Sequence, residues 1–213
     1  MNEIVLHDYW RSSAAYRVRI CLNLKQVRYT SVAVNLLEGA QRGDDNRAIN
    51  PQGLVPTLVV DGRALTQSLA IVDWLDATFP EPAMVSADPL VRSGQLARAL
   101  VVAADIHPID NLRVLKRLEQ QFSADQQARD DWYRHWVVEG LSALEAMAAD
   151  TPVGPFLGGE APDIADLCLV PQLYNARRFD VALDDWPRLR DADAAMAALP
   201  AVAAAHPDCV RPA

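Results

Sequence analysis

The pattern of apolar positions changes in character near residue 80. Before this point, short apolar or β-branched runs alternate with segments whose apolar residues recur at helical spacing. The short runs predict strands at 4–6, 28–34, 58–60 and 64–65, and the longer segments predict helices at about 12–25 and 66–79. Asp61-Gly62, between the last two strands, is a strong hairpin-turn signal. Residues 36–49 are polar and predict an irregular or short helical segment.

Beyond Phe79-Pro80-Glu81-Pro82 the strand signals stop, so we place a domain boundary there. The predicted domains are 1–80 and 88–213. Helical spacing continues at 89–106, 109–122, 125–149, 163–179 and 187–198. Pro108 has no N–H and must kink or restart its helix. Asp163, with Asp166 three residues later, indicates a helix start. The alanine-rich end predicts a last helix and then a frayed tail.

Composition and charge narrow the class of protein. Apolar residues form 51% of the 213 residues, which excludes a disordered chain. A net charge of -8 argues against nucleic acid or an anionic membrane as a partner. No apolar run reaches the ~20 residues needed to span a bilayer, and the acidic start does not resemble a signal peptide. Three scattered cysteines without metal-ligand spacing predict no metal site and a reducing, cytoplasmic location, with Cys21 a buried, inert thiol.

The segment YWRSSAAYRVRICL, residues 9–22, contains the first candidate chemistry. Ser12 and Ser13 stand where the first helix is expected to begin, directly after Arg11. Serine is a common helix cap, so the residues alone leave capping and ligand binding equally open. The start of a helix also lowers the pKa of a nearby thiol, because backbone N–H groups and the helix dipole favour negative charge.

Five motifs in order, together with this domain pattern, resemble the zeta class of the glutathione transferases. The resemblance extends to about residue 200. The motifs are Arg11-Ser12-Ser13 with Tyr16-Arg17-Val18-Arg19-Ile20, Asn50-Pro51-Gln52-Gly53-Leu54-Val55-Pro56, Gln67-Ser68, Asp105-Ile106-His107-Pro108 with Asn111-Leu112-Arg113, and Ala176-Arg177-Arg178-Phe179. Many members of the class have a cysteine where this chain has Ala14, and Ala15 replaces the next serine.

The resemblance implies an α/β thioredoxin-like N-terminal domain that binds glutathione and an all-α C-terminal domain that binds substrate. It implies glutathione-dependent cis–trans isomerisation of maleylacetoacetate, a dicarboxylate from tyrosine breakdown. Rotation about a double bond requires a lower bond order, which reversible addition of the glutathione thiolate provides. The sulfur is therefore not required from a protein cysteine. The class is also expected to form homodimers.

The resemblance assigns roles residue by residue. Ser12 is expected to stabilise the thiolate, with Ser13 as a second donor and Arg11 beside them. Arginine binds carboxylates in a bidentate manner and keeps its proton, which suits a dianionic substrate. The implied substrate-binding residues are Arg11, Arg113 and Arg178, with Arg177 a weaker candidate. The implied glutathione-binding residues are Gln41, Gln52, Val55 before an expected cis proline, Gln67, Ser68, Asp105, His107 and Asn111.

Each of these residues also has an ordinary explanation, such as a loop glutamine, a surface arginine or a structural histidine. Three other functions also stay open. Maleylpyruvate, from gentisate breakdown, is the alternative substrate. A transferase that conjugates apolar electrophiles needs an apolar second site, and the arginine set argues against it. A catalytically silent glutathione-binding module is the third, because both Ala14 and Ala15 lack a side-chain donor.

Overall fold

A computed structural model describes residues 3–212. The described chain divides into two compact units. One contains the residues up to Met84 together with the C-terminal segment from Ala197, and the other is Val85–Met196. The C-terminal segment lies in the stretch that the sequence placed in the helical domain, yet it belongs to the unit that contains the sheet. Among the described residues, no helix combines the length and apolar character needed to cross a membrane.

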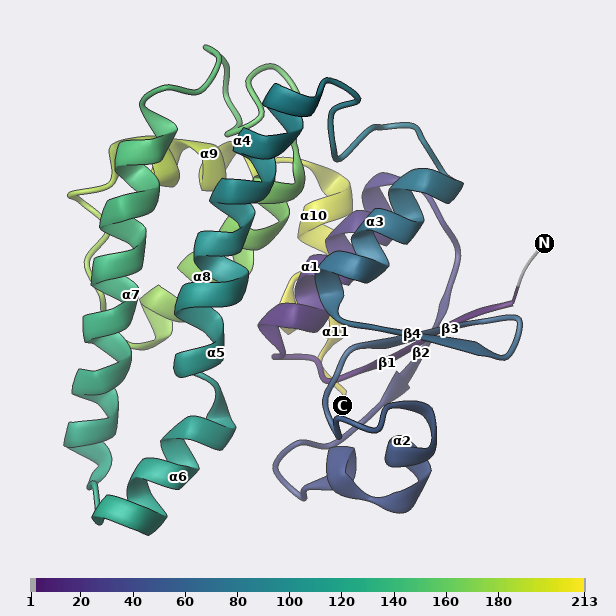
Figure 1. Cartoon of the computed structure of the whole chain (residues 1–213), viewed down its shortest axis with the longest axis vertical. Helices are drawn as coiled ribbons and strands as arrows, with labels where there is room; N and C mark the ends of the chain where they lie inside the picture. The colour runs from purple at the N-terminus through teal and green to yellow at the C-terminus, as the bar shows by residue number, and fades with distance from the viewer. Residues whose placement is uncertain (1–2, 213) are drawn as a thin grey trace. The chain divides into compact units, whose positions relative to one another are not determined.

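The first unit contains a four-stranded mixed sheet in the order β2-β1-β3-β4 (Figure 1). Its strands are β1 (Ile4–Asp8), β2 (Thr30–Ala33), β3 (Thr57–Val60) and β4 (Arg63–Thr66). β1 pairs in parallel with β2 and antiparallel with β3, and β3 pairs antiparallel with β4. The predicted hairpin is confirmed: Asp61 and Gly62 have φ values of 47° and 78°, as its turn requires.

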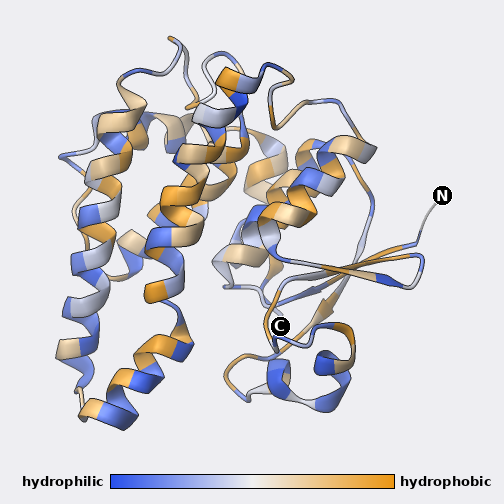
Figure 2. Ribbon diagram, viewed as in Figure 1, coloured by the Kyte–Doolittle hydropathy of each residue, from blue (hydrophilic) through white to orange (hydrophobic). Residues whose placement is uncertain are grey.

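Helices α1 (Ser13–Leu24) and α3 (Ser68–Thr78) pack against each other on one face of this sheet (Figure 1). The short η1 (Ala40–Arg42) and α2 (Asp44–Ile49) fill the segment predicted to be irregular or briefly helical. Figure 2 shows that α2 is largely hydrophilic, and its buried residue is the polar Asn46. α1 is buried on most of its sides, and Val18, Ile20 and Leu22 are all fully buried.

The expected frayed C-terminus is wrong. Two short helices, α10 (Pro200–Ala204) and α11 (Pro207–Val210), follow α9 (Pro187–Ala197), and α10 packs against α1. The Asn23 side chain donates to the Ala201 carbonyl at 3.0 Å, and Arg19 Nε donates to the Ala205 carbonyl at 3.1 Å. These long-range bonds order a segment whose local composition gave no reason to expect them.

The regular elements described in the second unit are helices. Its elements are α4 (Pro89–Leu100), η2 (Val101–Ile106), α5 (His107–Ile109), α6 (Leu112–Phe122), α7 (Gln126–Ala148), α8 (Ile164–Arg178) and most of α9. The predicted start of α8 is confirmed as a capping box between Asp163 and Asp166. The effect expected of Pro108 is also confirmed, because the helix becomes π-helical through η2 and ends soon after the proline.

Candidate functional site

Ser12 is the N-cap of α1. Its backbone is extended, and its Oγ accepts a hydrogen bond from the Ala15 N–H at 3.3 Å. This capping bond uses a lone pair of the hydroxyl and leaves its proton free to be donated. The side chain is half-buried, and the first turn of α1 contains no acidic residue. The end of α1 can therefore stabilise an anion while Ser12 still caps the helix.

Ser13 and Ser68 occupy the first turns of α1 and α3, and both are buried. Arg17, one turn into α1, donates from Nη1 to Ser68 Oγ at 3.3 Å, so the two helix starts are connected. Gln67, just before Ser68, has φ 67° and ψ 114°. A side chain other than glycine is uncommon at this conformation, and such residues cluster at ligand sites.

Gln41, Gln52 and Gln67 lie in one hydrogen-bonded loop system of the first unit. Gln67 Nε2 donates to Gln52 Oε1 at 2.9 Å. Asn46 Nδ2 donates to the Gln41 carbonyl at 2.9 Å. Gly53, at φ 62°, passes so close to this carbonyl that a Cβ would come within 3.2 Å of it. The first unit thus brings together the candidate residues that the sequence spread over residues 41–68.

Val55 precedes a cis peptide bond to Pro56, as the family resemblance implies. Asn50 supports this loop from both directions. Its Nδ2 donates to the Leu54 carbonyl at 3.0 Å, and its Oδ1 accepts from the Gln52 N–H at 3.1 Å. The buried Asn50 side chain therefore fixes the backbone on which Gln52 and Val55 are presented.

In the second unit, Asp105, His107, Asn111 and Arg113 fall on three different elements. His107 and Asn111 do not share a continuous helix, although a spacing of four residues would place them one turn apart on one. α5 ends at Ile109, and Asn111 is the extended N-cap of α6, with Oδ1 accepting from the Arg113 N–H at 3.2 Å. The break arises because Pro108 prevents the helix from continuing in its normal register. Asp105 and Arg113 are exposed.

The two arginines at the end of α8 differ in their partners. Arg177 forms an ion pair with the buried Asp193, at 2.6 Å, and this pair gives Arg177 a structural role. Arg178 Nη1 donates to Asn175 Oδ1 at 3.1 Å, and its guanidinium lies 5.8 Å from the centre of the Phe179 ring. The ranking of Arg178 above Arg177 as a substrate-binding candidate stays a prediction.

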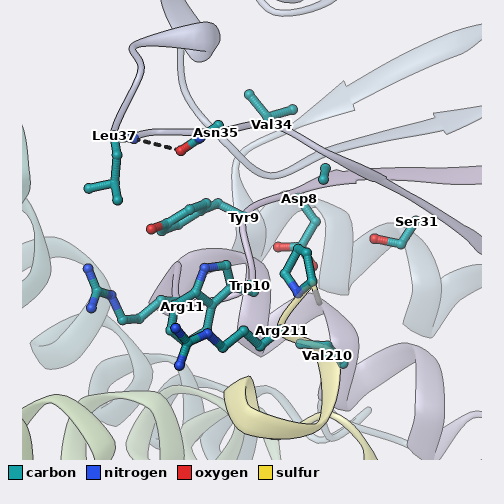
Figure 3. Close-up of a pocket in the computed structure, with 12 residues that line it drawn as sticks. Asp8, Tyr9, Trp10, Arg11, Ser31, Val34, Asn35, Leu37, Val210 and Arg211 are labelled. Carbon is teal, nitrogen blue, oxygen red and sulfur yellow. Dashed lines mark hydrogen bonds between the residues drawn. The ribbon is translucent and has the colours of Figure 1, made fainter.

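A cavity of about 540 Å³ opens in the first unit between the β1–α1 loop, the segment after β2 and the end of the chain (Figure 3). Arg11 lines it together with Tyr9 and Trp10. Arg211, which the sequence did not single out, lines it as well. A volume of this size is typical of small-molecule sites.

Two family models match this chain: the glutathione S-transferase N-terminal domain over residues 6–83, and the C-terminal domain over residues 126–204. The maleylacetoacetate isomerase of Rhizobium meliloti (strain 1021) is 47% identical over 99% of both chains. The structure of a maleylpyruvate isomerase, described as a bacterial zeta-class glutathione S-transferase, matches with TM-score 0.95 and 41% identity, covering 97% of this chain and 98% of its own. The chain belongs to the zeta class of the glutathione S-transferases.

A second solved relative is more informative about ligands. The maleylacetoacetate isomerase of Anaeromyxobacter dehalogenans 2CP-1 is 41% identical with TM-score 0.87, covering 99% of this chain and 98% of its own. Its active site holds dicarboxyethyl glutathione and citrate. The first of these ligands is glutathione that carries a dicarboxyethyl group.

The cysteines of this zeta-class transferase are poorly placed for thiol chemistry. Cys21 is buried in α1, and burial raises the pKa of its thiol to about 12, which confirms it as inert. Cys168 is also buried, in α8, whereas Cys209 is exposed. Among residues 3–212, no group of three histidine, cysteine or acidic side chains is arranged to hold a metal ion.

Asp110 is a feature of the transferase that sequence reasoning missed. It lies in the break between α5 and α6, with only 5% of its surface exposed. Neither carboxyl oxygen has a hydrogen-bond partner among the described residues, and burial raises the pKa of this carboxyl to about 8. Charged or titratable groups near it include Tyr133 on α7, whose own pKa Asp110 raises, and Arg178 near that tyrosine.

This carboxyl predicts a pH-dependent stability. The unfolded chain loses the Asp110 proton near pH ~4, whereas the folded chain keeps it until about pH 8. The folded state therefore binds the extra proton within this window, and its stability falls as pH rises, by up to about 1.4 kcal/mol per pH unit. Asp110→Asn, a neutral side chain of the same shape, should remove this contribution. Urea unfolding at several pH values checks it, and parallel curves for both proteins would contradict it.

Proposed function

We propose that this chain is a glutathione-dependent cis–trans isomerase of maleylacetoacetate. The observation that carries the proposal is the α1 N-terminus, where the Ser12 hydroxyl retains a proton to donate and no acidic residue opposes a thiolate. Support comes from the relative whose site holds a glutathione–dicarboxylate adduct. Maleylpyruvate stays the second candidate substrate, because the isomerase of that acid is also a close structural relative.

Residues of the first unit fit glutathione. Gln41 Oε1 is buried without a hydrogen-bond partner among the described residues and can accept one from the ligand's glycyl end. Gln67 and Ser68 stand at the start of α3, whose first turn is also free of acidic residues, and would bind the γ-glutamyl carboxylate. Gln52 would also approach the glycyl end, and the main chain of Val55 would pair with the cysteinyl residue. Asp105, His107 and Asn111 stay proposals for the polar ends of the tripeptide, with Asp105 suited to the γ-glutamyl ammonium of glutathione bound to a partner subunit.

When bound, glutathione supplies a thiolate whose reversible addition to the double bond permits rotation. The role of the protein is to stabilise the negative charges of the thiolate and of the substrate. Ser12 donates its hydroxyl proton in a hydrogen bond to the sulfur, and Ser13 is the second donor at the same helix start. Arg11, Arg113 and Arg178 bind the two carboxylates of the substrate and stabilise negative charge that develops on its carbonyl oxygen. Cations held ready where charge develops lower the barrier, because they need little reorganisation during the reaction.

We further propose a homodimer in the cytoplasm. The dimer rests on the family resemblance, and light scattering of the purified protein tests it. The location rests on the reduced state of Cys21, Cys168 and Cys209, which form no disulfide among the described residues, and on the need for glutathione.

The experiment offers the purified protein glutathione with maleylacetoacetate, maleylpyruvate or an apolar aryl halide. The proposal predicts fumaryl products from the maleyl acids, fastest from maleylacetoacetate, while the glutathione concentration stays constant. Loss of glutathione in proportion to product would instead indicate a conjugating transferase. Glutathione binding without turnover of any of the three would indicate a silent module. Faster turnover of maleylpyruvate than of maleylacetoacetate would make maleylpyruvate the leading candidate substrate.

A further inference from the structure

Arg11 and Arg211 both lie against the ring of Trp10. The Arg11 guanidinium carbon is 5.2 Å from the ring centre, and that of Arg211 is 5.1 Å from it. Both arginines line the cavity, and neither forms an ion pair with a carboxylate among the described residues. An anion bound in the cavity would be attracted by both positive charges.

The carboxylate that lines the same cavity is already neutralised. Asp8 accepts two hydrogen bonds from Arg19 Nη1, at 2.9 Å and 2.7 Å, and both side chains are buried. Asp8 is therefore unavailable to Arg11 or Arg211. The cavity presents a local positive charge on a chain whose net charge is -8.

Two neutral groups add hydrogen-bonding capacity. The Tyr9 hydroxyl is buried and has no hydrogen-bond partner among the described residues. It projects to the same side as the Arg11 guanidinium in Figure 3. Asn35 accepts the Leu37 N–H through Oδ1 at 3.1 Å, which leaves its amide NH₂ to donate (Figure 3). A buried hydroxyl without a partner is costly and indicates that a ligand completes the site.

The fold fixes the position of Arg211. It directly follows α11, whose first turn is capped by His206 Nδ1 accepting from the Asp208 N–H at 3.3 Å. The His206 ring meets the Tyr16 ring edge-on at 6.2 Å, so this helix is attached to α1. Arg211 is thus presented by an ordered segment.

We infer that this cavity binds one carboxylate of the dianionic substrate, and that Arg211 acts with Arg11 and the Tyr9 hydroxyl to select diacids over monoacids. The inference rests on the proposed function for the identity of the substrate. The C-terminal segment, through Arg211, would thus contribute to substrate specificity.

The test compares Arg211→Gln with Arg63→Gln, a matched change at an exposed arginine on β4 outside the cavity. Substrates are the diacid and its two monoacid analogues, each lacking one carboxylate. Arg211→Gln should raise KM for the diacid about tenfold, since loss of one charged hydrogen bond costs about 1.4 kcal/mol or more. It should leave KM unchanged for the analogue that lacks the carboxylate held here, and Arg63→Gln should change none.

Equal effects of Arg211→Gln on all three substrates, or no effect on the diacid, would overturn the inference. Calorimetric titration with citrate separates it from the proposed function, because binding needs no turnover. Arg211→Gln should weaken citrate binding about tenfold relative to the unaltered protein and Arg63→Gln. Equal citrate affinity in the three proteins would overturn the inference even if the chain is an isomerase. If the unaltered protein does not turn over the diacid but Arg211→Gln still weakens citrate binding, only the proposed function is overturned.

Discussion

Ser12→Ala should lower the rate of isomerisation about ten- to hundredfold, while glutathione still binds with similar affinity. A hydrogen bond to a charged partner contributes about 1.5–3 kcal/mol, and the serine hydroxyl is proposed to make that bond to the thiolate. The rest of glutathione is bound by other residues, so its affinity should change little. The pKa of the bound thiol should rise by about one to two units, which follows from the same energy. Ultraviolet titration of the thiolate in the complex measures this pKa.

The change also removes the cap of α1, so loss of structure needs a control. Asp125→Ala removes an equivalent cap from α7, where Asp125 Oδ1 accepts the Ala128 N–H at 2.8 Å. Both variants should lose about 1 kcal/mol of stability. Only Ser12→Ala should change the rate and the thiol pKa. If both variants lose activity equally, or if the thiol pKa is unchanged, Ser12 is a cap and no more.

Arg19→Gln should destabilise the protein by about 3–5 kcal/mol, because it leaves the Asp8 carboxylate buried without its partner. Arg19 also donates to the Trp10 carbonyl at 2.9 Å and to the Ala205 carbonyl at 3.1 Å. Its loss should therefore also loosen the C-terminal segment. Thermal unfolding measures the stability, and proteolysis near residue 205 measures the order of the segment.

Controls distinguish this ion pair from a general effect of losing charge. Arg28→Gln, at an exposed arginine after α1, should change stability by less than about 0.5 kcal/mol. Adding Asp8→Asn to Arg19→Gln should recover part of the loss, since no charge is then buried alone. The Arg19→Gln penalty should also shrink at low pH, where Asp8 becomes protonated. A small, pH-independent penalty for Arg19→Gln would contradict this role.

Local signals predicted the elements well, because their causes are local. The turn at Asp61-Gly62, the capping box at Asp163 and the interruption at Pro108 each depend on a few neighbouring residues. The family motifs likewise identified the candidate residues, and the first unit brings Gln41, Gln52 and Gln67 together through hydrogen bonds. The assigned roles of these residues stay predictions.

What the sequence missed depends on contacts between distant residues. Arg17 and Arg19 are charged, yet they are among the most buried side chains. Their burial is possible because Arg17 donates to Ser68 and Arg19 donates to Asp8. The return of the C-terminal segment to α1 has no local signature. Asp110 was missed for a similar reason, since it is buried near Tyr133, which lies on α7, more than twenty residues further along the chain. Arg211 could have been suspected only from its place beside Trp10, which the fold creates.

In the proposed reaction the attacking sulfur belongs to glutathione, and no cysteine of the protein takes part. The most direct measurement follows turnover of maleylacetoacetate by the purified protein with glutathione, without it, and with S-methylglutathione, which retains the peptide but has no ionisable thiol. We expect turnover when glutathione is the added thiol, and we expect S-methylglutathione to inhibit that turnover. Turnover without glutathione, or with S-methylglutathione in its place, would contradict it.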